Sequence, residues 1–260
     1  MTENAKKQIK ELLKSVIERK VNEYEAETEY KPFFEALFEK KDIQIGAIVQ
    51  SLYTTFGMSV YEQISVILAE DAGFKAQRQY TLLGSIDSDT ENFIDTYWNN
   101  LKTSLKINSG MKSDKNNEIQ LIKKSIKPGT AEKDGDSTVD VFITDKNGKE
   151  YYIDISTVKN NLKGFEVLKL KMLRWVGLRL STNPNADVGT YIAIPYNPYY
   201  PNDYMDSRWN TSILDGTNDI LVQEDYWNLV GDNPNTYTEL LEVFKEVGQE
   251  MKNTISKLFD

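Results

Sequence analysis

The chain contains neither histidine nor cysteine among its 260 residues. Without histidine it can hold no Ser-His-Asp triad, no histidine general base and no histidine-containing zinc finger or metal-finger nuclease site. Without cysteine it has no disulfides and no thiolate chemistry. Any hydrolytic chemistry must therefore use carboxylates, lysine and a hard metal ion.

Long apolar runs are also missing. No run approaches the roughly 18 residues of a membrane-spanning helix. The first residues, MTENAKKQIKELLKSV, are charged and amphipathic and lack the apolar centre of a secretion signal. Because 40% of the residues are hydrophobic and 11% are aromatic, the chain can form a sizeable core. We expect a globular, cytoplasmic protein with no membrane partner.

Apolar spacing predicts most of the secondary structure. Gly57 is expected to end one helix, and Ser59 to cap the next, with Glu62 as its capping-box partner. Strands are predicted over 139–144, 151–156, 188–195 and 219–222, and a polar loop over 108–117. Strands interrupted by a helix predict an α/β fold, with a mixed central sheet flanked by helices and an N-terminal helical subregion. The predicted helices cover 3–28, 32–39, 42–56, 60–70, 89–104, 162–180, 224–230 and 236–258.

A hairpin over 134–159, DGDSTVDVFITDKNGKEYYIDISTVK, carries two carboxylates on neighbouring strands. Asn147-Gly148 is a dipeptide that tight hairpin turns favour. Asp140 and Asp154 are separated by thirteen residues, a spacing that can bring both to one end of the sheet. Two carboxylates on rigid strands suit Mg²⁺, although both are equally explained as ordinary strand-end residues of an acidic chain.

The pattern D-x13-D on a hairpin followed by a helix resembles the PD-(D/E)xK core of type II restriction endonucleases. The stretches TTFGMSVYEQISVILAE, IDISTVKNNLKGFEVLKLKMLRW and YIAIPYNPYYPNDYMDSRW resemble the TdeIII/MjaII-type enzymes in particular. The resemblance runs from about Thr54 to the region of Tyr237. It implies a restriction-endonuclease-like fold, Mg²⁺ as cofactor, metal binding by Asp140 and Asp154, and a GGNCC-like recognition site.

The family pattern has lysine two residues after the second acid, where this chain has Ser156. A serine hydroxyl supplies no positive charge to the reacting phosphate. Three interpretations remain open: Lys159 fills the role, a lysine of the following helix (Lys163 or Lys169) fills it, or the protein binds DNA and cuts poorly. We expect Lys159 to be the catalytic cation.

Other side chains have both a functional and a structural interpretation. The resemblance implies that Glu62 approaches the metal, in competition with its capping role. Asn160, Asn161 and Lys163 open the predicted helix and suit either phosphate contact or capping. Lys171 and Arg174 are DNA contacts or merely solvated, and Arg208 either reads a guanine edge or packs on an aromatic ring.

The net charge of −9 argues against a polyanionic partner, but residues 101–180 alone carry +6. We therefore expect a Mg²⁺-dependent endonuclease that cleaves double-stranded DNA at a short palindrome as a homodimer. One nuclease domain should span 1–260, with a mainly helical subregion over 1–105 and a catalytic core over 106–260. The alternatives are a repair nuclease or resolvase of the same fold, a DNA-binding protein without cleavage, and an interaction module.

Overall fold

The computed structural model describes residues 1–23, 31–107, 110–156, 158–206 and 212–256. Five strands form one mixed sheet in the order β1-β2-β3-β4-β5. The first three are antiparallel neighbours, and β3, β4 and β5 run parallel. This confirms the predicted α/β class. The strands are β1 (Lys75–Leu83), β2 (Lys133–Thr144), β3 (Glu150–Ile155), β4 (Val188–Ile194) and β5 (Ile220–Val222).

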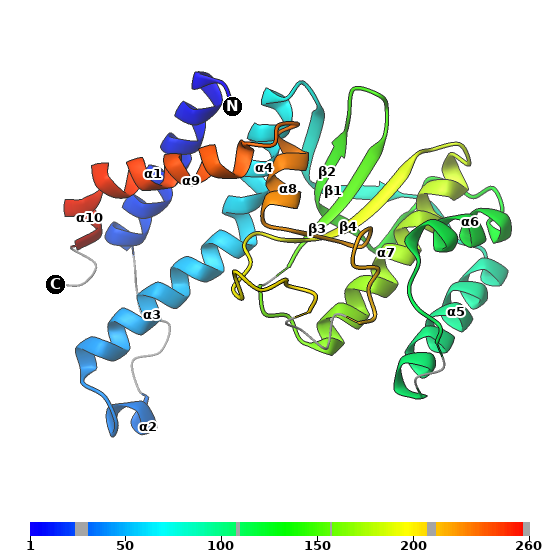
Figure 1. Cartoon of the computed structure of the whole chain (residues 1–260), viewed down its shortest axis with the longest axis horizontal. Helices are drawn as coiled ribbons and strands as arrows, with labels where there is room; N and C mark the ends of the chain where they lie inside the picture. The colour runs from blue at the N-terminus through cyan, green and yellow to red at the C-terminus, as the bar shows by residue number, and fades with distance from the viewer. Residues whose placement is uncertain (24–30, 108–109, 157, 207–211, 257–260) are drawn as a thin grey trace.

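Helices cover both faces of this sheet (Figure 1). On one face lie α5 (Ser88–Ile107), α6 (Lys115–Ser125) and α7 (Leu162–Thr182), and on the other lie α1 (Glu3–Glu23), α4 (Tyr61–Asp71), α8 (Glu224–Val230) and α9 (Thr236–Glu250). The remaining helices are α2 (Pro32–Glu35), α3 (Lys40–Thr55), the π-helix η1 (Phe56–Val60) and α10 (Lys252–Ser256). Among the described residues, none of these helices combines the length and the apolar character needed to cross a bilayer.

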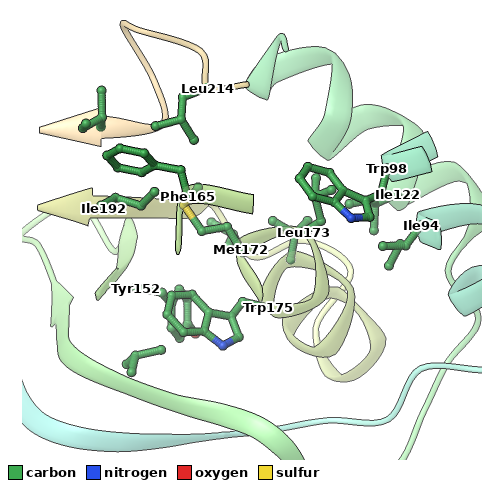
Figure 2. Close-up of a cluster of buried hydrophobic side chains, with 14 of the residues drawn as sticks. Ile94, Trp98, Ile122, Tyr152, Phe165, Met172, Leu173, Trp175, Ile192 and Leu214 are labelled. Atoms are coloured by element: carbon green, nitrogen blue, oxygen red, sulfur yellow. The ribbon is translucent and has the colours of Figure 1, made fainter. Parts of the chain in front are cut away.

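Each face of the sheet has its own apolar core. Trp175, Met172 and Leu173 of α7 pack with Trp98 and other residues of α5 and α6 in the first core, which Figure 2 shows. The second core joins β2, β3 and β4 to α1, α4, α8 and α9. A sheet covered on both sides holds its strands rigidly, and side chains at the strand ends inherit that rigidity.

Several local predictions differ from the structure, and three of them bear on the site or on the sheet. Gly57 does not end a helix: α3 continues through η1 into α4, and Ser59 donates back to the carbonyl of Thr55 instead of capping α4. The predicted loop over 108–117 is too long, because α6 begins at Lys115 and Asp114 caps it. No element was predicted between the helices over 60–70 and 89–104, where the structure has β1.

Candidate active site

Asp140 and Asp154 lie at the same end of the β2–β3 ladder. The β2–β3 ladder pairs Val141 with Ile153, and the two aspartates are the next residues on either side. The Ile155 amide donates to Asp140 Oδ2 at 2.8 Å, which fixes one carboxylate oxygen beside the neighbouring strand. The charge of Asp154 is close enough to raise the pKa of Asp140, and neighbouring like charges destabilise a sheet. The pairing therefore costs stability unless a cation lies between the carboxylates.

The sheet is irregular at this point. Val139 packs in the first core and Val141 in the second, so the alternation of side chains along β2 is interrupted at Asp140. On the adjoining strand β1, Gln79 has φ +48°, a backbone conformation that non-glycine residues seldom adopt. Backbone strain of this kind concentrates at functional sites, where surrounding contacts maintain it.

Gln79 connects a third carboxylate to the first two. Its Nε2 donates to Glu62 Oε1 at 2.9 Å and to Asp140 Oδ1 at 3.3 Å. Arg78 Nε donates to the other Glu62 oxygen at 3.1 Å. Glu62 is only 2% exposed, and its contacts come from β1, so the capping-box interpretation is wrong. Glu62 instead faces the strand that pairs with β2.

The site has an excess of negative charge. Burial raises the pKa of Asp140 to about 6, and the charges of Asp154 and then Glu62 add to the rise, against the lowering effects of the Ile155 amide and Lys171. A carboxylate in this setting is stabilised by any cation that enters. The donor set is oxygen only, which is the chemistry that Mg²⁺ prefers.

Within the described part of the chain, no three acidic side chains converge closely enough to enclose an ion. Mg²⁺ is commonly held by one or two carboxylates and completes its shell with water and substrate phosphate. Asp140 and Asp154 could hold the ion, with Glu62 behind them. The residues present therefore fit the metal that the sequence analysis expects.

A lysine lies at this site, although it is not the one expected. Lys171 Nζ on α7 is 2.7 Å from Asp154 Oδ2, and its side chain is 22% exposed. The ammonium also lies 4.9 Å from the centre of the Trp175 ring. The helix that follows β3 thus brings a positive charge to the second carboxylate. Sequence reasoning placed Lys171 among DNA contacts and missed this pairing.

The other candidates for the missing lysine are placed differently. Lys159 lies in the turn before α7 with an exposed side chain. Lys169 is 0% exposed and binds Glu118 and Asp219, so the idea that it replaces the motif lysine is wrong. Ser156 extends the sheet through its amide to the Ala193 carbonyl, and its hydroxyl accepts from Asn160.

The residues predicted to contact DNA have different surroundings in the structure. Asn161 caps α7 by accepting from the Gly164 amide, and Lys163 is exposed in the first turn of that helix. Arg174 forms ion pairs with Glu91 and Asp134, which leaves it less available to a phosphate. Arg208 lies outside the described residues.

A buried ionic cluster lies under α7. Lys169 contacts Glu118 at 2.5 Å and Asp219 at 2.6 Å, and Lys115 contacts Asp219 at 2.8 Å and the Thr190 side chain. Burial would raise the pKa of Asp219, but the two lysines hold it down. The sequence contained a signal for this cluster. Lys169 lies at helical spacing from the apolar residues 165, 172, 173 and 176, so it belongs to the face of the helix that is expected to be buried.

The structure has acidic side chains at the end of a mixed sheet that helices cover on both faces, and comparison with known proteins identifies its family. Residues 1–248 match the family described as "Type II restriction endonuclease, HinfI". The chain therefore belongs to the HinfI family of type II restriction endonucleases, which are site-specific deoxyribonucleases.

Curated relatives agree with this assignment. The chain is 26% identical to the type II restriction enzyme HgiCII of Herpetosiphon aurantiacus, over 87% of this chain and 81% of the relative. It is 28% identical to HgiEI from the same organism, over 84% and 77%. MjaII of Methanocaldococcus jannaschii is 26% identical, over 80% of this chain and 56% of the relative. The expected membership among restriction endonucleases related to MjaII is confirmed.

Proposed function

We propose that this protein is a Mg²⁺-dependent restriction endonuclease whose metal is held by Asp140 and Asp154. The observation that carries the proposal is the position of these two carboxylates at the same end of the β2–β3 ladder, close enough for the charge of Asp154 to raise the pKa of Asp140, with Lys171 on Asp154. Glu62 would act behind them, joined to Asp140 through Gln79. A purely structural pair of aspartates would not need to lie so close to each other, since neighbouring like charges cost stability.

The bound ion would polarise the scissile phosphate and lower the pKa of an attacking water. The protein's own groups would orient the reaction. The Ile155 amide fixes Asp140 at one oxygen, and the other oxygen accepts from Gln79. Lys171 would place its ammonium beside the phosphate and stabilise the negative charge that develops in the transition state.

We propose Lys171, rather than Lys159, as the cation that replaces the motif lysine at Ser156. The support is contact with Asp154, which the exposed Lys159 is not seen to make within the described residues. Lys171→Met should lower the cleavage rate by about two to three powers of ten, the size of a comparable electrostatic contribution. Lys159→Met and the control Lys7→Met should change it little. A large loss with Lys159→Met alone would restore the sequence-based expectation.

The substrate is double-stranded DNA, and the target would be a short palindrome read by a homodimer. The GGNCC-like site rests on the resemblance to the MjaII-type enzymes. Asn160, Asn161 and Lys163 at the start of α7 would contact the backbone phosphates, with Arg208 a candidate for base contact. A repair nuclease of the same fold, or a DNA-binding protein that cuts weakly because of Ser156, is the alternative.

Incubation with plasmid DNA and Mg²⁺ tests these points together. The expected result is a small set of discrete fragments with ends at one repeated sequence, and no cleavage with a chelator. Asp140→Ala should abolish cleavage and preserve the fold, whereas Asp95→Ala, at an exposed position of α5, serves as the matched control. Cleavage without sequence preference would favour the repair nuclease, and specific binding without cleavage would favour the weak or inactive enzyme.

A further inference from the structure

The segment formed by α2 and α3 has almost no core of its own. Of the sixteen residues of α3 only Ile48 is buried, and α2 buries none. Figure 1 shows the two helices projecting away from the sheet and its covering helices. A helix acquires most of its stability from packing an apolar face, and α3 packs little of its surface against the described part of the chain.

The exposed residues of this segment are nonetheless strongly apolar. Among those with large exposed fractions are Phe33 at 84%, Leu37 at 76%, Tyr53 at 59%, Phe34 at 58% and Phe38 at 53%. We call these five residues the apolar arm patch. At roughly 200 Å² for each whole aromatic side chain, the four aromatic members alone expose about 500 Å². The largest apolar patch of an ordinary monomer is roughly 300–600 Å² in total, and such patches usually mark interaction sites.

The patch continues into an aromatic cavity at the base of the arm. The cavity has a volume of about 610 Å³ and is lined by Tyr61, Tyr196, Trp227 and Phe244, among others. Phe56, the residue that follows α3, connects the two: its ring centre lies 5.7 Å from that of Tyr61 and 6.0 Å from that of Phe244. The arm therefore leads directly to the cavity.

The charge of the arm disfavours DNA as the molecule that covers it. Between residues 31 and 55 the arm carries three lysines, Lys31, Lys40 and Lys41, and three acids, Glu35, Glu39 and Asp42. A surface without net positive charge gains little from phosphate contact. Its apolar area fits a protein partner instead, and it approaches the roughly 800 Å² per partner of a standard interface once the cavity rim is included.

We infer that the apolar arm patch is the contact surface between two copies of this chain, arm against arm around a two-fold axis. Around such an axis the same patch serves both partners, so one apolar surface is self-complementary. Each copy would cover the other's phenylalanines while leaving the two carboxylate sites free. The inference rests on the homodimer part of the proposed function and not on the assignment of the metal ligands.

Single-cysteine variants provide a direct test, because the chain has no cysteine of its own. Phe33→Cys, Leu37→Cys and Tyr53→Cys are each oxidised under mild conditions and examined for covalent dimers. At least one should cross-link much faster than Val167→Cys, whose position on α7 is 65% exposed but outside the patch. Cross-linking of all three no faster than Val167→Cys would overturn the inference.

The second measurement is the mass of the protein in solution by light scattering or sedimentation. The double variant F33S/L37S should raise the dimer dissociation constant at least about tenfold, and the control Val167→Ser should not. Both patch residues are exposed within one chain, so the variant should unfold at the same denaturant concentration as the parent when both are monomeric. A monomeric parent, a double variant that dimerises as tightly, or a variant that loses DNA affinity without any change in mass would each overturn the inference. Failure to cleave DNA, with dimerisation through the arm intact, would instead count against the proposed function.

Discussion

Asp140→Asn should make the metal-free protein more stable at neutral pH, although Asp140 is a proposed metal ligand. The folded protein holds the Asp140 pKa at about 6, against 3.8 for an ordinary aspartate, first because of burial and then because of Asp154. A rise of about 2 in pKa corresponds to about 3 kcal/mol against the charged form. Asparagine removes the charge and keeps an oxygen that can accept from the Ile155 amide.

The direction of this stability change follows from the way the free energy of unfolding depends on pH. Between about pH 4 and pH 6 the folded chain binds a proton that the unfolded chain has released, so the free energy of unfolding falls as pH rises through this range. Above about pH 6 the folded protein carries the full free-energy cost of a charged Asp140 carboxylate. Because asparagine does not titrate, the stability difference between Asp140→Asn and the parent should grow from near zero at about pH 4 to at most about 3 kcal/mol at pH 7.

Urea unfolding with a chelator, repeated across this pH range, measures the difference. Asp95→Asn, at an exposed position, is the control and should follow the parent at every pH. Addition of Mg²⁺ should then stabilise the parent and not Asp140→Asn, because only a ligand that binds the folded state shifts the equilibrium. A difference that does not change with pH, or a variant less stable than the parent at pH 7, would show that the neighbouring carboxylates carry no such strain.

Three further outcomes are expected. Ser156→Lys should raise the cleavage rate little if Lys171 already supplies the cation, and a rise of two or more powers of ten would show that the charge is missing. Lys169→Met should lower the free energy of unfolding by about 3–5 kcal/mol, because it leaves two buried carboxylates with one lysine; an unchanged urea midpoint would contradict this. Specific DNA binding should weaken steeply with salt despite the net charge of −9, and a salt-independent affinity would indicate a ligand other than DNA.

The hairpin was predictable because its signals are local. Alternating residues, the Asn147-Gly148 turn and the spacing of Asp140 and Asp154 all lie within 26 residues, and the structure keeps that register. Gly148 has φ +86°, as the turn requires. Local pattern and tertiary pairing agree here, so the sequence alone indicated that two of the three proposed acids could lie at one end of the sheet.

The third acid and β1 could not be placed in the same way. The β1 sequence KAQRQYTLL is polar for most of its length and contains a left-handed residue at Gln79, so it lacks the apolar alternation of an expected strand. Its identity comes from pairing with β2, a segment more than fifty residues away. Glu62 looked like a helix cap because its true partners, Arg78 and Gln79, become neighbours only after β1 joins the sheet.

The absence of lysine at position 156 shows that the motif describes a location in space more than a position in the chain. A lysine two residues after Asp154 would lie on the same strand and face. In a parallel β3–α7–β4 unit the helix crosses back over the sheet, so a side chain of α7 can reach the same carboxylate from above. Lys169 and Lys171 are two residues, or about 200°, apart on α7, and therefore point in opposite directions. Lys169 lies on the face of α7 that packs inward, where it binds Asp219, whereas Lys171 contacts Asp154. Which face of the helix packs inward decides this difference, and the missing motif lysine alone could not reveal it.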